Sequence, residues 1–288
     1  MELFSVRNLC KSYGTFALRD VSLSLEEGYI MGFIGRNGAG KTTTLKCMLG
    51  LVHRDGGEVL MFGKDFQHHE LELKQEIGYM AGGIDYYPKT RIRHITDVAR
   101  RFYRSWDQGA YEGYLRRFDI DEDKRPSELS QGMRTKYSLA MALSHGARLL
   151  ILDEPTSGLD PVARDDLLEL FHDLVEDGRR GILFSTHITS DLEKCADFIA
   201  YIEEGKLLEC GELDSVLDSY RLIKGRADQF EGVAPRLIAS KRHSFGFTAL
   251  IRSADLGPGS EFTVETPGLE DIMVYCAKKE VPDEPAAL

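Results

Sequence analysis

A run of residues near the start of the chain has the types and spacing of a loop that binds phosphate. The run has the pattern GxxxxGK[ST] and consists of Gly35, Arg36, Asn37, Gly38, Ala39, Gly40, Lys41 and Thr42. Its glycines let backbone N–H groups approach phosphate oxygens, and a helix that begins here adds positive potential. We expect Lys41 to reach β- and γ-phosphates, and Thr42, with Thr43 beside it, to bind Mg²⁺. The alternative, a chance glycine turn, is disfavoured by the strand before the run and the helix after it.

Two acidic residues, Asp153 and Glu154, directly follow the apolar run 149–152. A buried strand that ends in carboxylates places them at a site rather than on a solvated surface. Asp153 can hold Mg²⁺ directly or through its waters, and Glu154 can then polarise an attacking water molecule. A structural acidic pair at a strand end is the alternative, and the phosphate-binding pattern makes it the weaker one.

Hydrophobic periodicity predicts the elements that must position these residues. Val21, Leu23 and Leu25 alternate with serines, as in a half-buried strand. The continuous apolar run 29–34 is typical of a strand covered on both faces. Further strands and helices alternate along the chain, with strands expected at 149–152 and 181–186 and helices at about 41–51, 162–176 and 189–195. This alternation indicates an α/β fold with a largely parallel sheet.

The chain is expected to form a large domain, 1–220, and a small C-terminal region, 221–288. The stretch from about 92 to 145 is rich in Arg, Tyr and Phe and is predicted to be a helical insert in the large domain. The C-terminal region is interpreted as a small α/β appendage with loose final residues. Its expected elements are strands at 245–252 and 261–264 and a helix that begins at Thr266 and Pro267.

Composition limits the classes of function. The 288 residues carry a formal net charge of -11, which argues against a nucleic-acid partner and against a polybasic membrane anchor. The five cysteines are scattered without a CxxC pair, so we expect reduced thiols. No apolar run approaches the ~20 residues of a transmembrane helix, and the start lacks the features of a signal peptide. If the protein works on a membrane, we expect another chain to span it.

One further motif distinguishes this chain from other proteins with a phosphate-binding loop. The stretch 129–133 reads LSQGM, and on its own it would be only a helix cap at Ser130. In the order phosphate loop, helical insert, LSQGM, acidic strand, PTSGLD (155–160) and STH (185–187), the chain resembles the ATP-binding cassette (ABC) family. The resemblance covers about residues 1–220. LSQGM differs from the family's LSGGQ at its third and fifth positions.

The resemblance implies a fold and a set of residue roles. The fold is that of a P-loop NTPase cassette, with a mostly parallel core sheet, an N-terminal antiparallel β subdomain and a helical insert. Tyr13 would stack on adenine, for which a core tyrosine is the alternative. His187 would contact the γ-phosphate and orient the water, as a catalytic residue alongside Lys41 and Glu154. The remaining positions would act between two cassettes: Ser130, Gln131 and Gly132 at the γ-phosphate bound to the opposite subunit, and Asp160 at the dimer contact.

The resemblance also implies a function. The chain would be the ATP-hydrolysing subunit of a transporter, with ATP and Mg²⁺ as cofactors. Its partners would be a second cassette, identical or paralogous, and an integral membrane permease that holds it at the inner face of the cell membrane. The stretch 102–107, FYRSWD, resembles a stretch in bacterial exporter ATPases of the antibiotic- or peptide-resistance type. This resemblance points to export. The alternatives are a soluble cassette that acts on ribosomes or DNA and a metabolic P-loop kinase. The transported substrate and the role of 221–288 stay open.

The sequence departs from the family at one functional position. In the family, a glutamine that senses Mg²⁺ and water and links the site to the membrane subunit normally follows the position of the stretch 77–80. Here the chain reads AGGID at 81–85, and neither Gly82 nor Gly83 can supply a side-chain ligand. Either a water molecule or Asp85 substitutes, or the coupling to the membrane subunit is altered. We favour a substitute, since the other hydrolytic residues are present.

Overall fold

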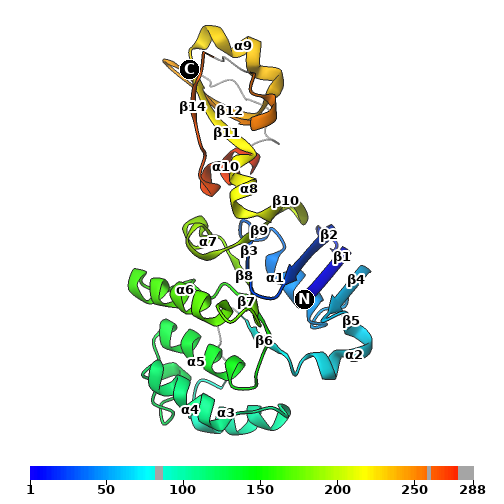
Figure 1. Cartoon of the computed structure of the whole chain (residues 1–288), viewed down its shortest axis with the longest axis vertical. Coiled ribbons are helices and arrows are strands. Elements are labelled where there is room, and N and C mark those ends of the chain that lie inside the picture. Colours follow the sequence, from blue (N-terminus) through cyan, green and yellow to red (C-terminus); the bar gives the residue numbers. More distant parts are fainter. Residues whose placement is uncertain (82–86, 258–260, 278–288) are drawn as a thin grey trace. The chain divides into compact units, whose positions relative to one another are not determined.

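The computed structural model describes residues 1–81, 87–257 and 261–277, and the chain divides into two compact units, Met1–Cys210 and Gly211–Leu288 (Figure 1). The division precedes the boundary expected at 220/221. The helix α8 (Leu213–Asp218) joins the second unit because its end is hydrogen-bonded there. Ser253 Oγ donates to the carbonyl of Asp218 at 2.6 Å, and the backbone N–H of Ser253 donates to the carbonyl of Ser219 at 2.9 Å.

The first unit begins with an antiparallel sheet in the order β2-β1-β4-β5, as the resemblance implied. Its strands are β1 (Glu2–Tyr13), β2 (Phe16–Glu26), β4 (Gly56–Met61) and β5 (Lys64–Asp65), and α2 (Phe66–Leu73) follows. In β2, Val21, Leu23 and Leu25 are buried and the serines between them are exposed, which confirms the half-buried strand. The buried face belongs to a core shared with the second sheet.

The second sheet has the strand order β10-β9-β3-β8-β7-β6, and the pairs from β6 to β9 are parallel. Its strands are β3 (Ile30–Ile34), β6 (Ile77–Met80), β7 (Leu149–Asp153), β8 (Gly181–Thr186), β9 (Phe198–Glu203) and β10 (Lys206–Glu212). Every residue of β3, β7 and β8 is buried. Apolar runs therefore form these strands because both of their faces are covered.

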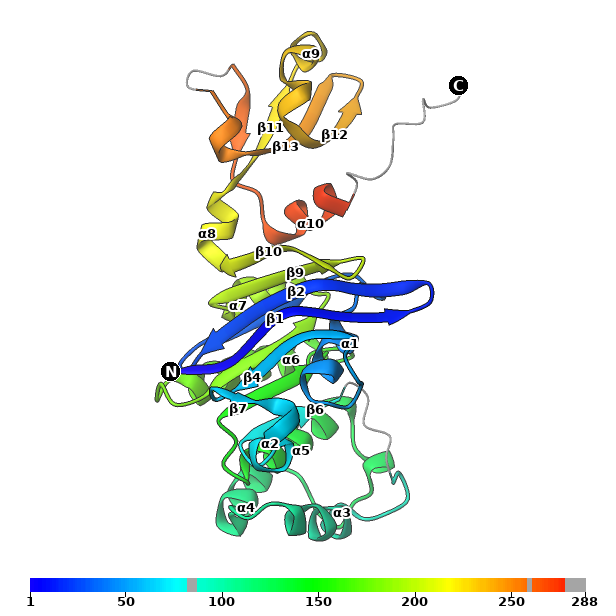
Figure 2. The same cartoon turned by 90° about the vertical axis from the view of Figure 1, so that its right-hand side faces the viewer.

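Helices cover the parallel sheet on the two faces. The helix α1 (Lys41–Met48) packs into the core that the sheet shares with the antiparallel sheet. On the other side lie α6 (Pro161–Val175) and α7 (Thr189–Cys195), as Figures 1 and 2 show. α1 ends earlier than the expected 51, because the chain turns at Gly50 with a φ of 67°.

The insert contains the helices that the sequence led us to expect. They are α3 (Ile92–Ala99), α4 (Gln108–Arg117) and α5 (Gln131–Leu143), with 3₁₀ turns at Arg100–Phe102 and Pro126–Glu128. A buried hydroxyl joins all three helices. Thr96 Oγ1 of α3 lies 2.8 Å from the hydroxyl of Tyr111 and 3.0 Å from that of Tyr137.

In the parts of the chain that the structure describes, no helix is both long enough and apolar enough to span a membrane.

The second unit has a small sheet of its own, in the order β12-β13-β11-β14. The strands are β11 (Tyr220–Gly225), β12 (Leu237–His243), β13 (Gly246–Arg252) and β14 (Thr263–Glu265), and α9 (Phe230–Val233) and α10 (Leu269–Ala277) accompany them. The expected start of the last helix is wrong. α10 begins at Leu269, so Thr266 is not its cap and Pro267 is not its first residue; the N–H of Gly268 donates to Asp271 Oδ2 at 3.2 Å. Residues 281–288, expected to be loose, lie outside the described residues.

A single glycine connects the phosphate loop to the antiparallel sheet. The N–H of Gly205 donates to the carbonyl of Ala39 at 2.9 Å, and its carbonyl accepts the N–H of Arg19 at 2.8 Å. Gly205 has a φ of 77°, and a Cβ there would lie 1.9 Å from the carbonyl oxygen of Ala17. Only a residue without a side chain can therefore make both hydrogen bonds.

This contact predicts a stability difference between two glycine variants. Gly63 has a φ of 76° with open space around it, so Gly63→Ala carries the backbone strain without the clash. We expect Gly63→Ala to lower the free energy of unfolding by about 1–2 kcal/mol. Gly205→Ala should lower it by about 2–5 kcal/mol, because overpacking adds to the strain. Urea unfolding of both variants tests this, and equal losses would contradict the close contact at Gly205.

Candidate active site

The register of the parallel strands brings three chain segments to one edge of the sheet. Ile34 of β3 pairs with Thr186 of β8, and Asp153 of β7 pairs with Ser185. The phosphate loop that follows Ile34, the acidic residue after Asp153 and the histidine after Thr186 must therefore emerge side by side. The segments are far apart in the sequence, so only the sheet brings them together.

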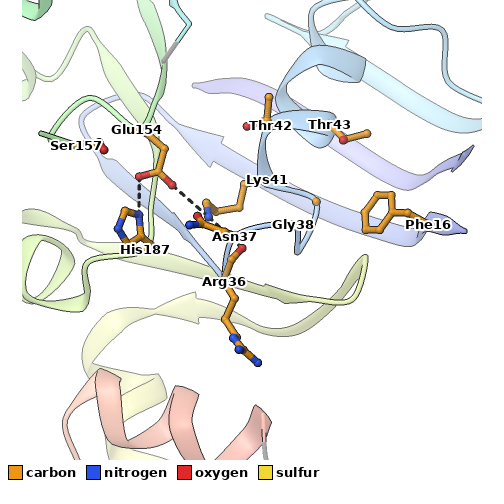
Figure 3. Close-up of a pocket in the computed structure, with 11 residues that line it drawn as sticks. Phe16, Arg36, Asn37, Gly38, Lys41, Thr42, Thr43, Glu154, Ser157 and His187 are labelled. Carbon is orange, nitrogen blue, oxygen red and sulfur yellow. Dashed lines mark hydrogen bonds and ion pairs between the residues drawn. The ribbon is translucent and has the colours of Figure 1, made fainter. Parts of the chain in front are cut away.

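A pocket of about 330 Å³ lies at this edge (Figure 3). Its described lining comes from the phosphate loop, α1, β2 and the segments after β7 and β8: Phe16, Arg36, Asn37, Gly38, Gly40, Lys41, Thr42, Thr43, Glu154, Ser157 and His187. Gly38 and Gly40 have φ values of 84° and 117°, which residues other than glycine rarely adopt. A Cβ on Gly40 would also lie 2.7 Å from Leu18 Cδ2. The loop is thus folded as a phosphate cradle requires.

Lys41 is held at the centre of the site. Its side chain is nearly buried, and Nζ donates to the carbonyl of Gly35 at 2.7 Å and to that of Arg36 at 3.3 Å. Nζ also lies 3.2 Å from Glu154 Oε1. A buried ammonium needs such partners, because an unpaired one would be strongly destabilising.

Asp153 accepts hydroxyl hydrogens on both carboxylate oxygens. Thr42 Oγ1 donates to Oδ2 at 2.8 Å, and Ser185 Oγ donates to Oδ1 at 2.6 Å. Thr42 and Asp153, predicted as metal ligands, are therefore adjacent and offer the hard oxygen atoms that Mg²⁺ prefers. Within 1–81, 87–257 and 261–277, no group of three or more His, Cys, Asp or Glu side chains could hold a metal ion. Mg²⁺ is usually held by one or two protein oxygens together with phosphates and water.

Glu154 points into the pocket between two basic side chains. Its Oε1 faces Lys41, and its Oε2 lies 2.9 Å from Nδ1 of His187 (Figure 3). Glu154 has a φ of 50°, an uncommon conformation for a residue with a side chain, and one that is often found at functional sites. The His187 side chain is 43% exposed, so this pair remains open to solvent.

The residues predicted to act between subunits lie apart from this pocket. Ser130 caps α5, since its Oγ accepts the N–H of Met133 at 3.2 Å. Asp160 caps α6 by accepting the N–H groups of Val162 and Ala163, each at 3.0 Å. The bond from Ala163 is the largest of the effects that hold the pKa of Asp160 below its usual value. Ser130, Gln131, Gly132 and Asp160 are absent from the described lining of the pocket.

The aromatic residue at the pocket differs from the predicted one. The described lining includes Phe16 and does not include Tyr13, which is its partner across the β1–β2 hairpin and is 48% exposed. Figure 3 shows Phe16 at the far end of the loop from Glu154 and His187. The stacking of Tyr13 on adenine stays a prediction.

The sequence analysis also missed two serines of the site. Ser157 lines the pocket, and Ser185 forms hydrogen bonds with Asp153 and Glu154. Both belong to motifs that the sequence analysis identified.

The position where the family has a glutamine is the last functional position of the sequence analysis. Residues 82–86 lie outside the described residues, and they include Gly82, Gly83 and Asp85. The substitution of the glutamine by water or by Asp85 therefore stays a hypothesis.

Comparisons with known proteins show which family the chain resembles. Residues 18–157 match a family described as ABC transporter. The chain is 34% identical over 235 residues to the ABC transporter ATP-binding protein YtrB of Bacillus subtilis (strain 168), covering 81% of this chain and 80% of YtrB. It is 33% identical over 210 residues to the bacitracin transport ATP-binding protein BcrA of Bacillus licheniformis, covering 72% of this chain and 69% of BcrA. A solved ATP-binding subunit of an ABC transporter superposes with a TM-score of 0.67 at 29% identity, covering 74% of this chain and 91% of that one.

The chain therefore belongs to the family of ABC transporter ATP-binding proteins. It is an ATPase subunit whose hydrolysis of ATP drives transport through a separate membrane permease.

The geometry predicts the effect of removing one charge from the site. In Glu154→Gln the side chain keeps its size but can no longer act as a base, so ATP hydrolysis should fall roughly 100-fold or more. ATP binding should remain, because the phosphate loop and Lys41 are unchanged. The matched control is Glu169→Gln, which removes an exposed carboxylate from α6. Phosphate release by the purified wild-type chain and the two variants measures their rates of hydrolysis. Undiminished turnover in Glu154→Gln would exclude Glu154 as the general base.

Proposed function

We propose that this chain binds ATP with Mg²⁺ in the pocket at the carboxyl edge of β3, β7 and β8. The observation that carries the proposal is the joint placement of Lys41, Asp153, Glu154 and His187 around the phosphate loop. The loop and Lys41 hold the phosphates, and Thr42 and Asp153 supply oxygen ligands for Mg²⁺, which would neutralise phosphate charge. Phe16 and Tyr13 are the candidate aromatic contacts for the base.

The existing contacts suggest how binding prepares the site. Lys41 Nζ now contacts the carbonyl of Gly35 and the carboxylate of Glu154. An incoming phosphate competes for the ammonium, and Glu154 then loses its contact with Lys41. The freed carboxylate oxygen can orient a water molecule and accept its proton, while the other oxygen stays in contact with His187. Positioning and charge neutralisation then account for catalysis.

A second cassette is proposed to complete the site. Ser130 begins a helix whose N-terminus attracts anions, and this N-terminus does not line the chain's own pocket. Facing a second copy, identical or paralogous, Ser130, Gln131 and Gly132 would contact the γ-phosphate bound there, and Asp160 would lie at the contact. ATP would then hold the two subunits together until hydrolysis removes the bridge.

A role in transport is proposed from two relatives, and its direction from the stretch 102–107. BcrA is named for bacitracin transport, and YtrB is named as a transporter subunit. These names favour transport over a soluble cassette that acts on ribosomes or DNA. The stretch 102–107 supports export, through a permease that places this chain at the inner face of the cell membrane.

Mixing two inactive variants tests the shared site. Lys41→Ala damages the phosphate loop but keeps the 130–132 segment, and Gly132→Asp damages that segment but keeps the loop. A Cβ on Gly132 would lie 3.6 Å from Leu159 and Ala163, so the substitution fits the fold and acts through its charge. In a mixed dimer, one site combines the intact loop with the intact segment. We expect the mixture to hydrolyse ATP clearly faster than the sum of the separate variants.

The control for this experiment is Gly113→Asp, which adds a charge to α4 where a Cβ meets open space. It should retain wild-type hydrolysis on its own. If the mixture shows no more than the summed rates while the control is active, the two motifs act within one chain and the proposed arrangement is wrong.

A further inference from the structure

A serine that does not line the pocket connects the two acidic residues of the site. Ser185 is the penultimate residue of β8 and is 0% exposed. Its Oγ donates to Asp153 Oδ1 at 2.6 Å and accepts the backbone N–H of Glu154 at 2.9 Å. One hydroxyl thus fixes the side chain of one acid and the backbone of the next.

We propose that Ser185 is a positioning residue that sets the orientation of both carboxylates. With Oδ1 of Asp153 bound to Ser185, Oδ2 is the oxygen that faces Thr42, at 2.8 Å from Oγ1. The carboxylate plane is therefore fixed from both ends. Ser185 acts through Asp153 and Glu154 and needs no contact with the nucleotide. The inference rests on the proposed Mg²⁺-ATP site.

The hydroxyl is suited to this task because it donates and accepts at the same time. An alanine would take the donor away from Asp153 Oδ1, and Asp153 is itself only 5% exposed, so water would compensate poorly. The N–H of Glu154 would keep only its second partner, the Ser185 carbonyl at 3.1 Å. Hydrogen bonds to charged groups are stronger than those between neutral groups, so the loss falls mainly on Asp153.

The Glu154 contact matters because the backbone there is strained. A φ of 50° persists only where neighbouring contacts hold it. The conformation aims the side chain at Lys41 and His187. Weakening the contact lets the backbone relax and moves the general base from its place. Ser185 therefore affects both the oxygen proposed to bind the metal and the base, and its hydroxyl bonds to neither Lys41 nor the glycines of the phosphate loop.

Ser185→Ala separates these effects from loss of structure. We expect ATP affinity in EDTA to stay within about twofold of wild type, because no phosphate contact changes. The gain in affinity on adding Mg²⁺ should shrink roughly tenfold or more, and the Mg²⁺ concentration for half-maximal hydrolysis should rise by a similar factor. The turnover number should fall at saturating Mg²⁺. Displacement of a fluorescent ATP analogue measures binding, and phosphate release measures hydrolysis.

Two further variants complete the test. Ser185→Thr keeps the hydroxyl and should restore the Mg²⁺ dependence. Ser144→Ala removes a hydroxyl that is also 0% exposed but bonds to the carbonyl of Ala140 at the end of α5. It should leave both the Mg²⁺ dependence and the turnover number unchanged.

Any other result would contradict either the positioning role of Ser185 or the proposed Mg²⁺-ATP site. An unchanged Mg²⁺ dependence and turnover number in Ser185→Ala would overturn the inference, as would equal losses in Ser144→Ala. Loss of ATP binding in EDTA would also overturn it, because that result indicates a structural role. If the wild-type chain itself shows neither Mg²⁺-dependent ATP binding nor hydrolysis, the proposed Mg²⁺-ATP site fails, which is a separate result.

Discussion

Parallel pairing of β3, β8 and β7 is the constraint on which the site depends. It brings the phosphate loop, Asp153 with Glu154, and His187 to one edge of the sheet, although they are spread over much of the chain. These strands are buried on both faces, and a shift along the sheet would draw the charged residues that follow them into the covered core. The chemistry of the site is thus a consequence of core packing, and it needs no special contacts to bring its parts together.

Within that frame, the charged groups of the site are paired with one another and with hydrogen-bonding groups. Lys41 is compensated by carbonyl oxygens and Glu154, Glu154 also meets His187, and Asp153 accepts two hydroxyls. This pairing explains how a deeply placed ammonium and carboxylate are tolerated in the fold.

Much of this could be predicted from the sequence, and the failures have physical causes. The motif residues Lys41, Asp153 and Glu154 were identified because their types and spacing follow from the chemistry. Phe16 was missed because the hairpin turn that decides which aromatic faces the pocket depends on tertiary packing. The start of α10 was placed too early, since Thr266 and Pro267 carry start signals that the second unit does not use. Ser185 was seen only as part of a motif, because its two bonds depend on the pairing of β7 with β8.

A structure of the chain with Mg²⁺ and a non-hydrolysable ATP analogue tests the central claim most directly. The account predicts the triphosphate on the backbone N–H groups of the loop, with Lys41 Nζ moved from the carbonyl of Gly35 to the phosphates. It also predicts Mg²⁺ between Thr42 and Asp153, and Ser130 of a second subunit at the γ-phosphate. Phosphates bound away from the carboxyl edge of β3, β7 and β8 would contradict the account.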